Sequence, residues 1–381
     1  MKEIGIYIHI PFCKQKCYYC DFISYAKQEE KFSKYVENLK KEIKNKAKKY
    51  NKEKNKVNTI YIGGGTPSIL ESKHIKEIIN ILQENYTVIN EPEITIEVNP
   101  GTVDEQKLNE YLKMGINRIS IGLQTTNDVL LKQIGRIHTY NQFLDCYKVA
   151  RKVGFKNINV DLMLALPNQT LQILEESLEK VIKLDPEHIS LYSLIVEENT
   201  MIEKMIEEKK IELPDEKIER KMYWKTKHIL EDNGYIHYEI SNFAKKGYKS
   251  KHNYNCWNQK EYLGFGLAAH SYVDNTRYCN ISNFDEYITN IEEDKTEKNT
   301  IICEVQNEEE KRKEYMLLGL RKIDGVNIQE FKNKFVENPI YLYRKELNKL
   351  IEENLLEIDL NNIKLTNKGL DLANLVWEEF V

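Results

Sequence analysis

The feature that most constrains this chain is a group of three cysteines near its start. Cys13, Cys17 and Cys20 follow the short apolar run at residues 7–12 and have the spacing Cys-x3-Cys-x2-Cys. Three thiols on one loop can converge on one point, and thiolates are soft ligands that suit zinc or iron–sulfur clusters better than magnesium or calcium. The alternatives are a disulfide pair with a spare thiol, or chance clustering. A cytosolic chain rarely carries disulfides, so the stretch predicts a metal site.

The number of ligands narrows the kind of metal. Structural zinc normally takes four protein ligands, and no fourth ligand stands near the three cysteines. Four cysteines usually hold a [4Fe–4S] cluster, so three would leave one iron open. An open coordination position is where a metal site can perform chemistry.

The residues around these cysteines carry a family resemblance. The run Tyr7-Ile8-His9-Ile10-Pro11-Phe12-Cys13, together with the cysteine spacing, resembles the radical S-adenosylmethionine (SAM) superfamily. Within it the run is similar to the branch of oxygen-independent coproporphyrinogen oxidases and the related heme chaperones. The resemblance covers the whole chain, and it implies that the open iron binds the amino and carboxylate groups of SAM.

Composition limits the partners and the compartment. The 381 residues carry 56 Lys+Arg against 60 Asp+Glu, a net charge of -4, which gives no global attraction to nucleic acid. The start shows no secretory signal and no run of eighteen apolar residues occurs, so a cytoplasmic protein without a transmembrane segment is expected. The four scattered cysteines, Cys146, Cys256, Cys279 and Cys303, are predicted to be small buried hydrophobic residues.

The first half alternates β-branched runs with amphipathic stretches, which predicts βα units and a parallel sheet. The expected strands are 4–10, 59–62, 94–98, 118–123, 158–164 and 188–194. The expected helices are 31–50, 72–85 with Ser72 as its cap, 104–114, 140–153 ending at Gly154, and 171–184. Six units are too few for a closed eight-stranded barrel, and periodicity leaves an open doubly wound sheet or a partial barrel. The family resemblance implies a (β/α)6 partial barrel.

The pattern changes after about residue 200. A helix is expected over 215–232, an irregular strand over 234–242, a Gly- and aromatic-rich segment over 251–272, and a charged linker over 292–298. From residue 308, helices followed by two short strands at 355–359 and 362–365 predict a winged-helix-like α+β module for packing or partner binding. The predicted domains are 1–200 for the barrel core, 201–300 for a barrel-closing region, and 301–381 for the C-terminal domain.

Polar or glycine features follow every predicted strand, and function in α/β barrels gathers at the carboxyl ends of strands. The run Gly63-Gly64-Gly65 lets backbone approach a ligand, although it could be a bare tight turn; it lacks the lysine of a phosphate loop. Glu97 could accept hydrogen bonds from two ribose hydroxyls, or be an exposed strand-end charge. The resemblance implies that SAM is bound by Tyr7, Tyr19, Gly64, Gly65, Thr66, Glu97, Gln124, Arg136, Asp161, Ile195 and His270.

A second motif lies at His252-Asn253-Tyr254-Asn255-Cys256-Trp257. It resembles the His-Asn-x-x-Tyr-Trp signature associated with heme in the chaperone branch, with Cys256 where tyrosine is usual. Histidine and cysteine can both ligate heme iron, and a tryptophan can contact the macrocycle. The resemblance therefore implies heme contacts by His252, Cys256 and Trp257, with His270 as a further candidate. The alternative is a histidine that serves only as a structural hydrogen-bonding group.

Three hypotheses follow: a heme chaperone on a radical-SAM scaffold, an oxygen-independent coproporphyrinogen III oxidase, and a non-catalytic metal-stabilised protein. The oxidase resemblance would call for a fourth cysteine at position 22, where Phe22 stands, and for an N-terminal extension, whereas six residues precede Tyr7. Both departures favour the chaperone, with a [4Fe–4S] cluster, SAM and heme as cofactors. The heme acceptor, the cleavage of SAM, the heme ligand, peripheral membrane contact and the choice of monomer or dimer are left open.

Overall fold

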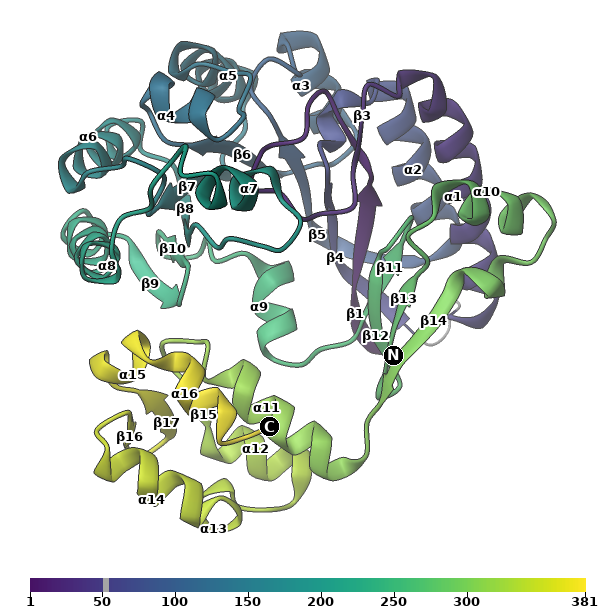
Figure 1. Cartoon of the computed structure of the whole chain (residues 1–381). Coiled ribbons are helices and arrows are strands. Elements are labelled where there is room, and N and C mark those ends of the chain that lie inside the picture. Colours follow the sequence, from purple (N-terminus) through teal and green to yellow (C-terminus); the bar gives the residue numbers. More distant parts are fainter. Residues whose placement is uncertain (51–54) are drawn as a thin grey trace.

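The centre of the protein is one twisted, twelve-stranded sheet. The computed structural model describes residues 1–50 and 55–381, and the sheet has the order β14-β13-β12-β11-β1-β4-β5-β6-β7-β8-β10-β9 (Figure 1). Its strands are β1 Lys2–Ile10, β4 Asn55–Gly64, β5 Thr87–Val98, β6 Arg118–Gln124, β7 Ile158–Leu164, β8 His188–Ser193, β9 Ile236–Glu239, β10 Asn242–Ala244, β11 Tyr262–Phe265, β12 His270–Val273, β13 Thr276–Asn280 and β14 Thr300–Val305. The six predicted strands pair in parallel in this sheet, in chain order.

Helices cover the outer face of the parallel strands (Figure 1). They are α1 Phe32–Lys49, α2 Ser72–Asn85, α3 Glu105–Lys113, α4 Asp128–Gln133, α5 Tyr140–Val153, α6 Leu171–Ile182 and α8 Glu216–Asp232. The short helix α7 Met201–Glu207 lies inside this ring of helices, next to the cysteine loop. The α5 helix begins with a capping box between Thr139 and Gln142 and ends at Gly154, whose φ of 112° only glycine adopts freely. The expected cap at Ser72 is wrong: Glu71 occupies the N-cap position, without a side-chain cap.

The sheet remains open, which agrees with the predicted partial barrel. The β11 strand runs parallel to β1, and β12, β13 and β14 continue from it as an antiparallel extension, while β10 and β9 extend the other edge. The charged linker expected over 292–298 is wrong, because α10 Phe284–Glu292 and a 3-10 helix at Thr296–Asn299 occupy that region. The extension was hidden in the sequence because β14 is exposed along nearly its whole length and shows no alternating pattern.

The α9 helix, Lys251–Trp257, lies between the barrel and the C-terminal domain (Figure 1). Its first two backbone N–H groups donate to the Glu93 carboxylate at 3.0 and 2.9 Å. His252 is 6% exposed, and its ring reaches Thr59 in the first half of β4. This helix therefore closes the amino-terminal end of the barrel, opposite the cysteine loop.

The C-terminal domain has a hydrophobic core of its own, built from residues between Tyr315 and Phe380. Its elements are α11 Glu308–Gly319, β15 Val326–Asn327, α12 Ile328–Phe335, α13 Pro339–Leu342, α14 Arg344–Glu352, β16 Leu356–Ile358, β17 Asn362–Leu365, α15 Asn367–Asp371 and α16 Ala373–Glu378. Helices followed by the three-stranded sheet β15-β17-β16 match the predicted winged-helix-like α+β fold. The Trp224 indole of the barrel donates to Asp371 of this domain at 2.8 Å.

Two general expectations can be compared with this fold. Among the described residues, no helix combines the length and the apolar character needed to cross a bilayer. The expectation that all four scattered cysteines are buried is wrong: Cys146 is buried, Cys256 and Cys279 are half-buried, and Cys303 is exposed. The last two lie on the antiparallel extension, where one face of the strands is open to solvent.

Candidate functional site

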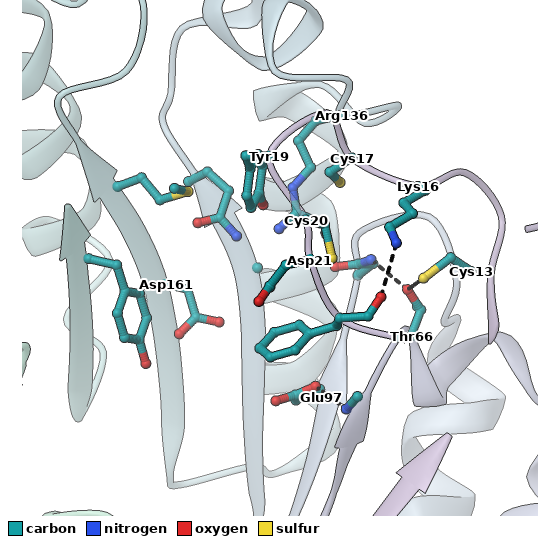
Figure 2. Close-up of a pocket in the computed structure, with 18 of the residues that line it drawn as sticks. Cys13, Lys16, Cys17, Tyr19, Cys20, Asp21, Thr66, Glu97, Arg136 and Asp161 are labelled. Atoms are coloured by element: carbon teal, nitrogen blue, oxygen red, sulfur yellow. Dashed lines mark hydrogen bonds between the residues drawn. The ribbon is translucent and has the colours of Figure 1, made fainter. Parts of the chain in front are cut away.

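A cavity of about 430 Å³ lies at the carboxyl ends of the parallel strands, beneath the cysteine loop (Figure 2). The predicted metal and SAM residues that line it are Cys13, Cys17, Cys20, Tyr19, Gly64, Gly65, Thr66, Glu97, Gln124, Arg136, Asp161 and Ile195. They come from many separate segments, and the parallel topology brings them together because all these strands end on the same side.

The glycine run after β4 holds one side of the cysteine loop. The Gly65 N–H donates to the Ile10 carbonyl at 2.9 Å, and the Thr66 N–H donates to the Phe12 carbonyl at 2.7 Å. A Cβ on Gly65 would lie 2.6 Å from the Phe12 carbonyl oxygen and 3.0 Å from Cys13 Sγ, so no other residue fits there. The Thr66 hydroxyl donates to Cys13 Sγ at 3.4 Å. The triple glycine thus positions the first thiol.

The other side of the loop is held by the segment before Arg136. The Tyr18 N–H donates to the Ile134 carbonyl at 3.0 Å, and the Tyr18 carbonyl accepts from the Ile202 N–H of α7 at 2.9 Å. Gly135 has a φ of 78°, and a Cβ there would lie 2.8 Å from the Tyr18 ring. Because two backbone segments and α7 fix its course, the loop presents its cysteines in a defined arrangement.

The donor set fits a cationic iron–sulfur cluster. Cys13, Cys17 and Cys20 are all free thiols facing one cavity (Figure 2). Burial, the largest cause, raises the pKa of Cys13, and burial together with the two neighbouring thiols raises the pKa of Cys20 to about 11. Thiolates in this place need a compensating positive charge, which coordinated iron provides.

Glu97, at the end of β5, faces the floor of the cavity (Figure 2). Its Oε1 accepts from the Tyr61 hydroxyl at 2.9 Å, and its Oε2 accepts from the Gly64 N–H at 3.1 Å. Burial raises the pKa of Glu97 to about 7, and the charge of Asp161 adds to the rise, although the two hydrogen bonds oppose it. Each carboxylate oxygen keeps acceptor capacity for a ligand hydroxyl.

Arg136 enters the cavity beside the cysteines and Tyr19 (Figure 2). Its Nη1 donates to Asn99 Oδ1 at 3.0 Å, whereas its buried Nε has no hydrogen-bond partner among the described residues. An unpaired buried guanidinium N–H is costly, so this group is suited to an incoming anion such as a carboxylate. The unpaired Nε–H of Arg136 therefore favours a ligand that carries a carboxylate near the cysteines.

Two further predicted residues show signs of local constraint. Asp161 Oδ1 accepts from Asn159 Nδ2 at 2.7 Å and Oδ2 from the Ser120 hydroxyl at 3.2 Å, and burial raises its pKa. Gln124 has a φ of 73° at the end of β6, where the pairing with β7 is irregular. A non-glycine residue in the left-handed region is strained, and such strain clusters at ligand sites.

Five predicted residues lie outside the lining of this cavity. Tyr7 is half-buried on β1, and its hydroxyl bonds His9 Nδ1 at 3.0 Å. His270 is exposed at the start of β12. The remaining three belong to α9, at the opposite end of the barrel: His252, Cys256 and Trp257.

The His252 ring is fully enclosed by barrel residues. Its Nδ1 shares a hydrogen bond with the Thr59 hydroxyl at 2.9 Å, and its ring lies 5.3 Å from that of Tyr61. Burial, followed by the positive charge of Arg118, lowers the pKa of His252 to about 4. Trp257 lies against the C-terminal domain, with the Arg321 guanidinium 4.5 Å from its ring centre. The contacts around α9 are those of a packed helix.

Sequence reasoning missed several residues of the cavity. Tyr61 and Ser120 line it without having been predicted, and Asn99 binds both Arg136 and Thr66. Alternation was the available signal: Tyr61 lies two residues before Gly63 and thus on the same face of β4. Tyr61 was overlooked because the search concentrated on the ends of strands.

Comparisons with known proteins agree with this geometry. Residues 7–181 match the model of the radical SAM superfamily, and residues 306–372 match that of the HemN C-terminal domain. The structure of coproporphyrinogen III oxidase (HemN) from Escherichia coli superimposes with a TM-score of 0.86, covering 100% of this chain and 90% of that one at 22% identity. Fold and family model together define a protein of the radical SAM superfamily.

Similarity over the full length identifies the family within this class. The heme chaperone HemW of Lactococcus lactis is 38% identical over 380 residues, covering 100% of this chain and 98% of the relative. HemW of Bacillus subtilis is 38% identical over 379 residues, covering 98% of each. The chain belongs to the HemW family.

Proposed function

We propose that this protein is a heme chaperone that holds a [4Fe–4S] cluster through Cys13, Cys17 and Cys20, binds SAM beside it, and passes heme to an acceptor protein. The observation that carries the proposal is the convergence of the three thiols and the unpaired Arg136 Nε on one cavity. The similarity to relatives known as heme chaperones supports the heme-carrying role.

When bound by Cys13, Cys17 and Cys20, the cluster would supply an open iron for SAM and a source of electrons. Arg136 lines the cavity and is held by Asn99, and its guanidinium would pair with the SAM carboxylate. Glu97, fixed by Tyr61 and Gly64, accepts hydrogen bonds from the ribose hydroxyls. Gly64, Gly65 and Thr66 provide backbone without steric obstruction, and Tyr19, Gln124, Asp161 and Ile195 complete the SAM site.

The placement of Tyr7 suggests an indirect role in the SAM site. Its ring stacks on Tyr61 with the centroids 6.3 Å apart, and the charge of Glu97 contributes to the raised pKa of Tyr7. Tyr7 therefore supports the Tyr61–Glu97 pair from below. For His270, the SAM contact remains a prediction from the resemblance.

Heme contact near His252, Cys256 and Trp257 is likewise a prediction from the resemblance. In the geometry described above, His252 would have to give up its bond to Thr59 before Nδ1 could ligate iron. Cys256 is half-buried and Trp257 is partly exposed beside the C-terminal domain, so these two side chains are more accessible than His252.

The test compares the chaperone with the coproporphyrinogen III oxidase. One anaerobically reconstituted preparation is titrated with hemin and, in parallel, incubated with coproporphyrinogen III, SAM and a reductant. Saturable Soret shifts at one heme per chain without formation of protoporphyrinogen IX support the chaperone. Turnover of coproporphyrinogen III without saturable hemin binding would overturn it. A Cys17→Ser variant controls for heme that binds independently of the cluster.

The remaining proposals concern partners and organisation. We propose that the protein is cytoplasmic, does not bind nucleic acid, and acts as a monomer or a dimer. The acceptor protein is to be identified by pull-down with the heme-loaded protein as bait. The division into residues 1–200, 201–300 and 301–381 remains a prediction. Limited proteolysis tests it, since the proposed boundaries predict that cleavage begins near residues 200 and 300.

A further inference from the structure

A second group of metal-ligating side chains lies outside the cavity, on the antiparallel extension of the sheet. His270 of β12, Cys279 of β13 and Cys303 of β14 each offer one ligand atom, and these atoms all lie within 4.8 Å of one another. His270 and Cys303 are exposed and Cys279 is half-buried, so solvent ions reach all three.

The strand register places these residues together. His270 lies directly opposite Cys279 in the antiparallel pairing of β12 with β13, so their side chains share one face. The pairing of β13 with β14 is irregular at Arg277 and Tyr278, whose partners Glu304 and Ile302 leave Cys303 as an extra residue. A bulge of this kind redirects a side chain, and here the Cys303 thiol lies 3.4 Å from the Cys279 thiol.

The donor atoms are available for a ligand. Within residues 1–50 and 55–381, neither ring nitrogen of His270 takes part in a hydrogen bond, and Cys279 Sγ contacts only Cys303 Sγ. Cys303 adds one weak contact, to the Ile301 carbonyl at 3.8 Å. Apart from these two contacts, the three donor atoms form no hydrogen bonds within the described part of the chain.

We propose that His270, Cys279 and Cys303 form a second metal site, which binds one zinc ion and leaves its fourth coordination position open. Two thiolates and an imidazole are a ligand set that suits zinc, and three protein ligands leave room for a water or an incoming ligand. The site is separate from the three cysteines of the cavity and does not depend on the proposed chaperone function.

The distances favour a metal over a disulfide. Tetrahedral zinc with Zn–S bonds of about 2.3 Å holds two thiolates about 3.8 Å apart, so the 3.4 Å pair needs to open by only about 0.4 Å. A disulfide requires about 2.05 Å, a closure of about 1.3 Å that the backbone of two strands must accommodate. Three donors that converge on one point also suit a small ion better than heme, whose axial ligands stand on opposite faces of a wide ring.

The assignment gives His270 a role other than the predicted SAM contact. The β11–β12 register sets His270 opposite Gly264, which in turn pairs with Tyr7, so the site lies on the same face of the sheet as Tyr7. His270 is nonetheless absent from the lining of the SAM cavity. A His270→Ala variant should therefore bind zinc less tightly.

The experiment uses cluster-loaded protein, so that Cys13, Cys17 and Cys20 are occupied. Reduced holoprotein is dialysed anaerobically against micromolar zinc, and bound zinc is measured by elemental analysis. Wild type should bind one zinc per chain more than Cys279→Ser/Cys303→Ser. His270→Ala should weaken binding roughly tenfold or more, since even outer-shell changes cost metal sites about 10- to 100-fold. Cobalt in place of zinc should give thiolate-to-cobalt absorption in the difference spectrum of wild type but not in that of Cys279→Ser/Cys303→Ser.

Ile302→Ser is the matched control, because Ile302 is an exposed neighbour on β14 that is 66% accessible and belongs to none of the ligands. It should retain the zinc. Equal zinc in wild type and the double variant would overturn the proposal. A Cys279–Cys303 disulfide that persists in glutathione buffer would also overturn it, because the pair would then be a redox element. Saturable hemin binding that is lost in the double variant would overturn it as well, because it would assign these residues to heme iron.

Discussion

The cysteine loop and the α9 helix both carry a cofactor-like motif, yet they occupy opposite ends of the barrel and different environments. The loop lies over a cavity of about 430 Å³ with donors left unpaired. The α9 helix fills the amino-terminal end, where Glu93 accepts from two of its N–H groups and Thr59 bonds His252. Resemblance to a motif predicts a cofactor site at both the cysteine loop and α9. Unpaired polar groups and an open cavity are found at the loop, and they distinguish a ligand site from a packed helix.

The largest effect is expected from the loop. Cys17→Ser should abolish cluster loading, because three thiolates are the only protein ligands proposed for the iron. Iron content and the broad visible absorbance after reconstitution measure it. Cys303→Ser, an exposed cysteine elsewhere, serves as the control and should load normally. A Cys17→Ser protein that holds a full cluster would remove the distinction between the loop and the other cysteines.

At the opposite end of the barrel, His252→Ala should act on stability. The change leaves the Thr59 hydroxyl without its partner and opens a void against Tyr61, which together lower the free energy of unfolding by about 3 kcal/mol. Urea unfolding measures it, and the exposed His228→Ala is the matched control. Cluster absorbance of the folded variant should be intact. Unchanged stability combined with lost heme affinity would instead place a heme ligand in α9.

The same ring also predicts a pH dependence. The pKa of His252 is about 4 in the folded protein, against about 6.5 when unfolded, so the unfolded chain binds the extra proton between these values. Stability therefore falls as pH drops from about 6.5 toward 4, and this one group contributes about 2 kcal/mol of loss by pH 5. His252→Asn should show a shallower fall in acid-dependent urea titrations. Parallel curves for the two proteins would contradict a buried neutral ring.

Glu97→Gln tests whether the Glu97 carboxylate contributes to the proposed SAM site. Replacing a carboxylate that accepts from ribose hydroxyls with an amide should weaken SAM binding about tenfold, or about 1.4 kcal/mol. Because the pKa of Glu97 is about 7, wild-type affinity should rise between pH 6 and 8 as the carboxylate ionises, whereas that of the variant should stay flat. Equilibrium dialysis of labelled SAM measures both. An identical pH profile in the two proteins would show that Glu97 does not bind the ligand.

The smallest effect is expected from Trp257→Phe. The indole Nε1 has no hydrogen-bond partner, and phenylalanine keeps an aromatic face for Arg321, so stability should change little. If heme lies against this segment, its affinity should fall roughly fivefold, or about 1 kcal/mol. Hemin titration of the two proteins decides it. Equal affinities would leave α9 with a packing role alone.

The elements that could be predicted are those whose signal is local. The β7 strand and the α2 and α5 helices match the predicted ranges residue for residue. Their signals are the β-branched run, the helical spacing of apolar residues and the terminating Gly154, and each depends only on residues close in the sequence. The convergence of Glu97, Asp161 and the cysteine loop followed from parallel topology. The packing of His252 could not be predicted, because Thr59 lies 193 residues away in the chain.

The open edge of the sheet has a practical consequence for handling the protein. The β14 strand is the last in its sheet, its edge is unpaired within the described residues, and Ile301, Ile302 and Val305 are each at least 50% exposed. Such an edge is a template for strand addition by another chain, and Cys303 can then cross-link the pair on exposure to air. Concentrated, oxidised samples should therefore aggregate through β14, and preparations kept anaerobic and dilute should remain dispersed.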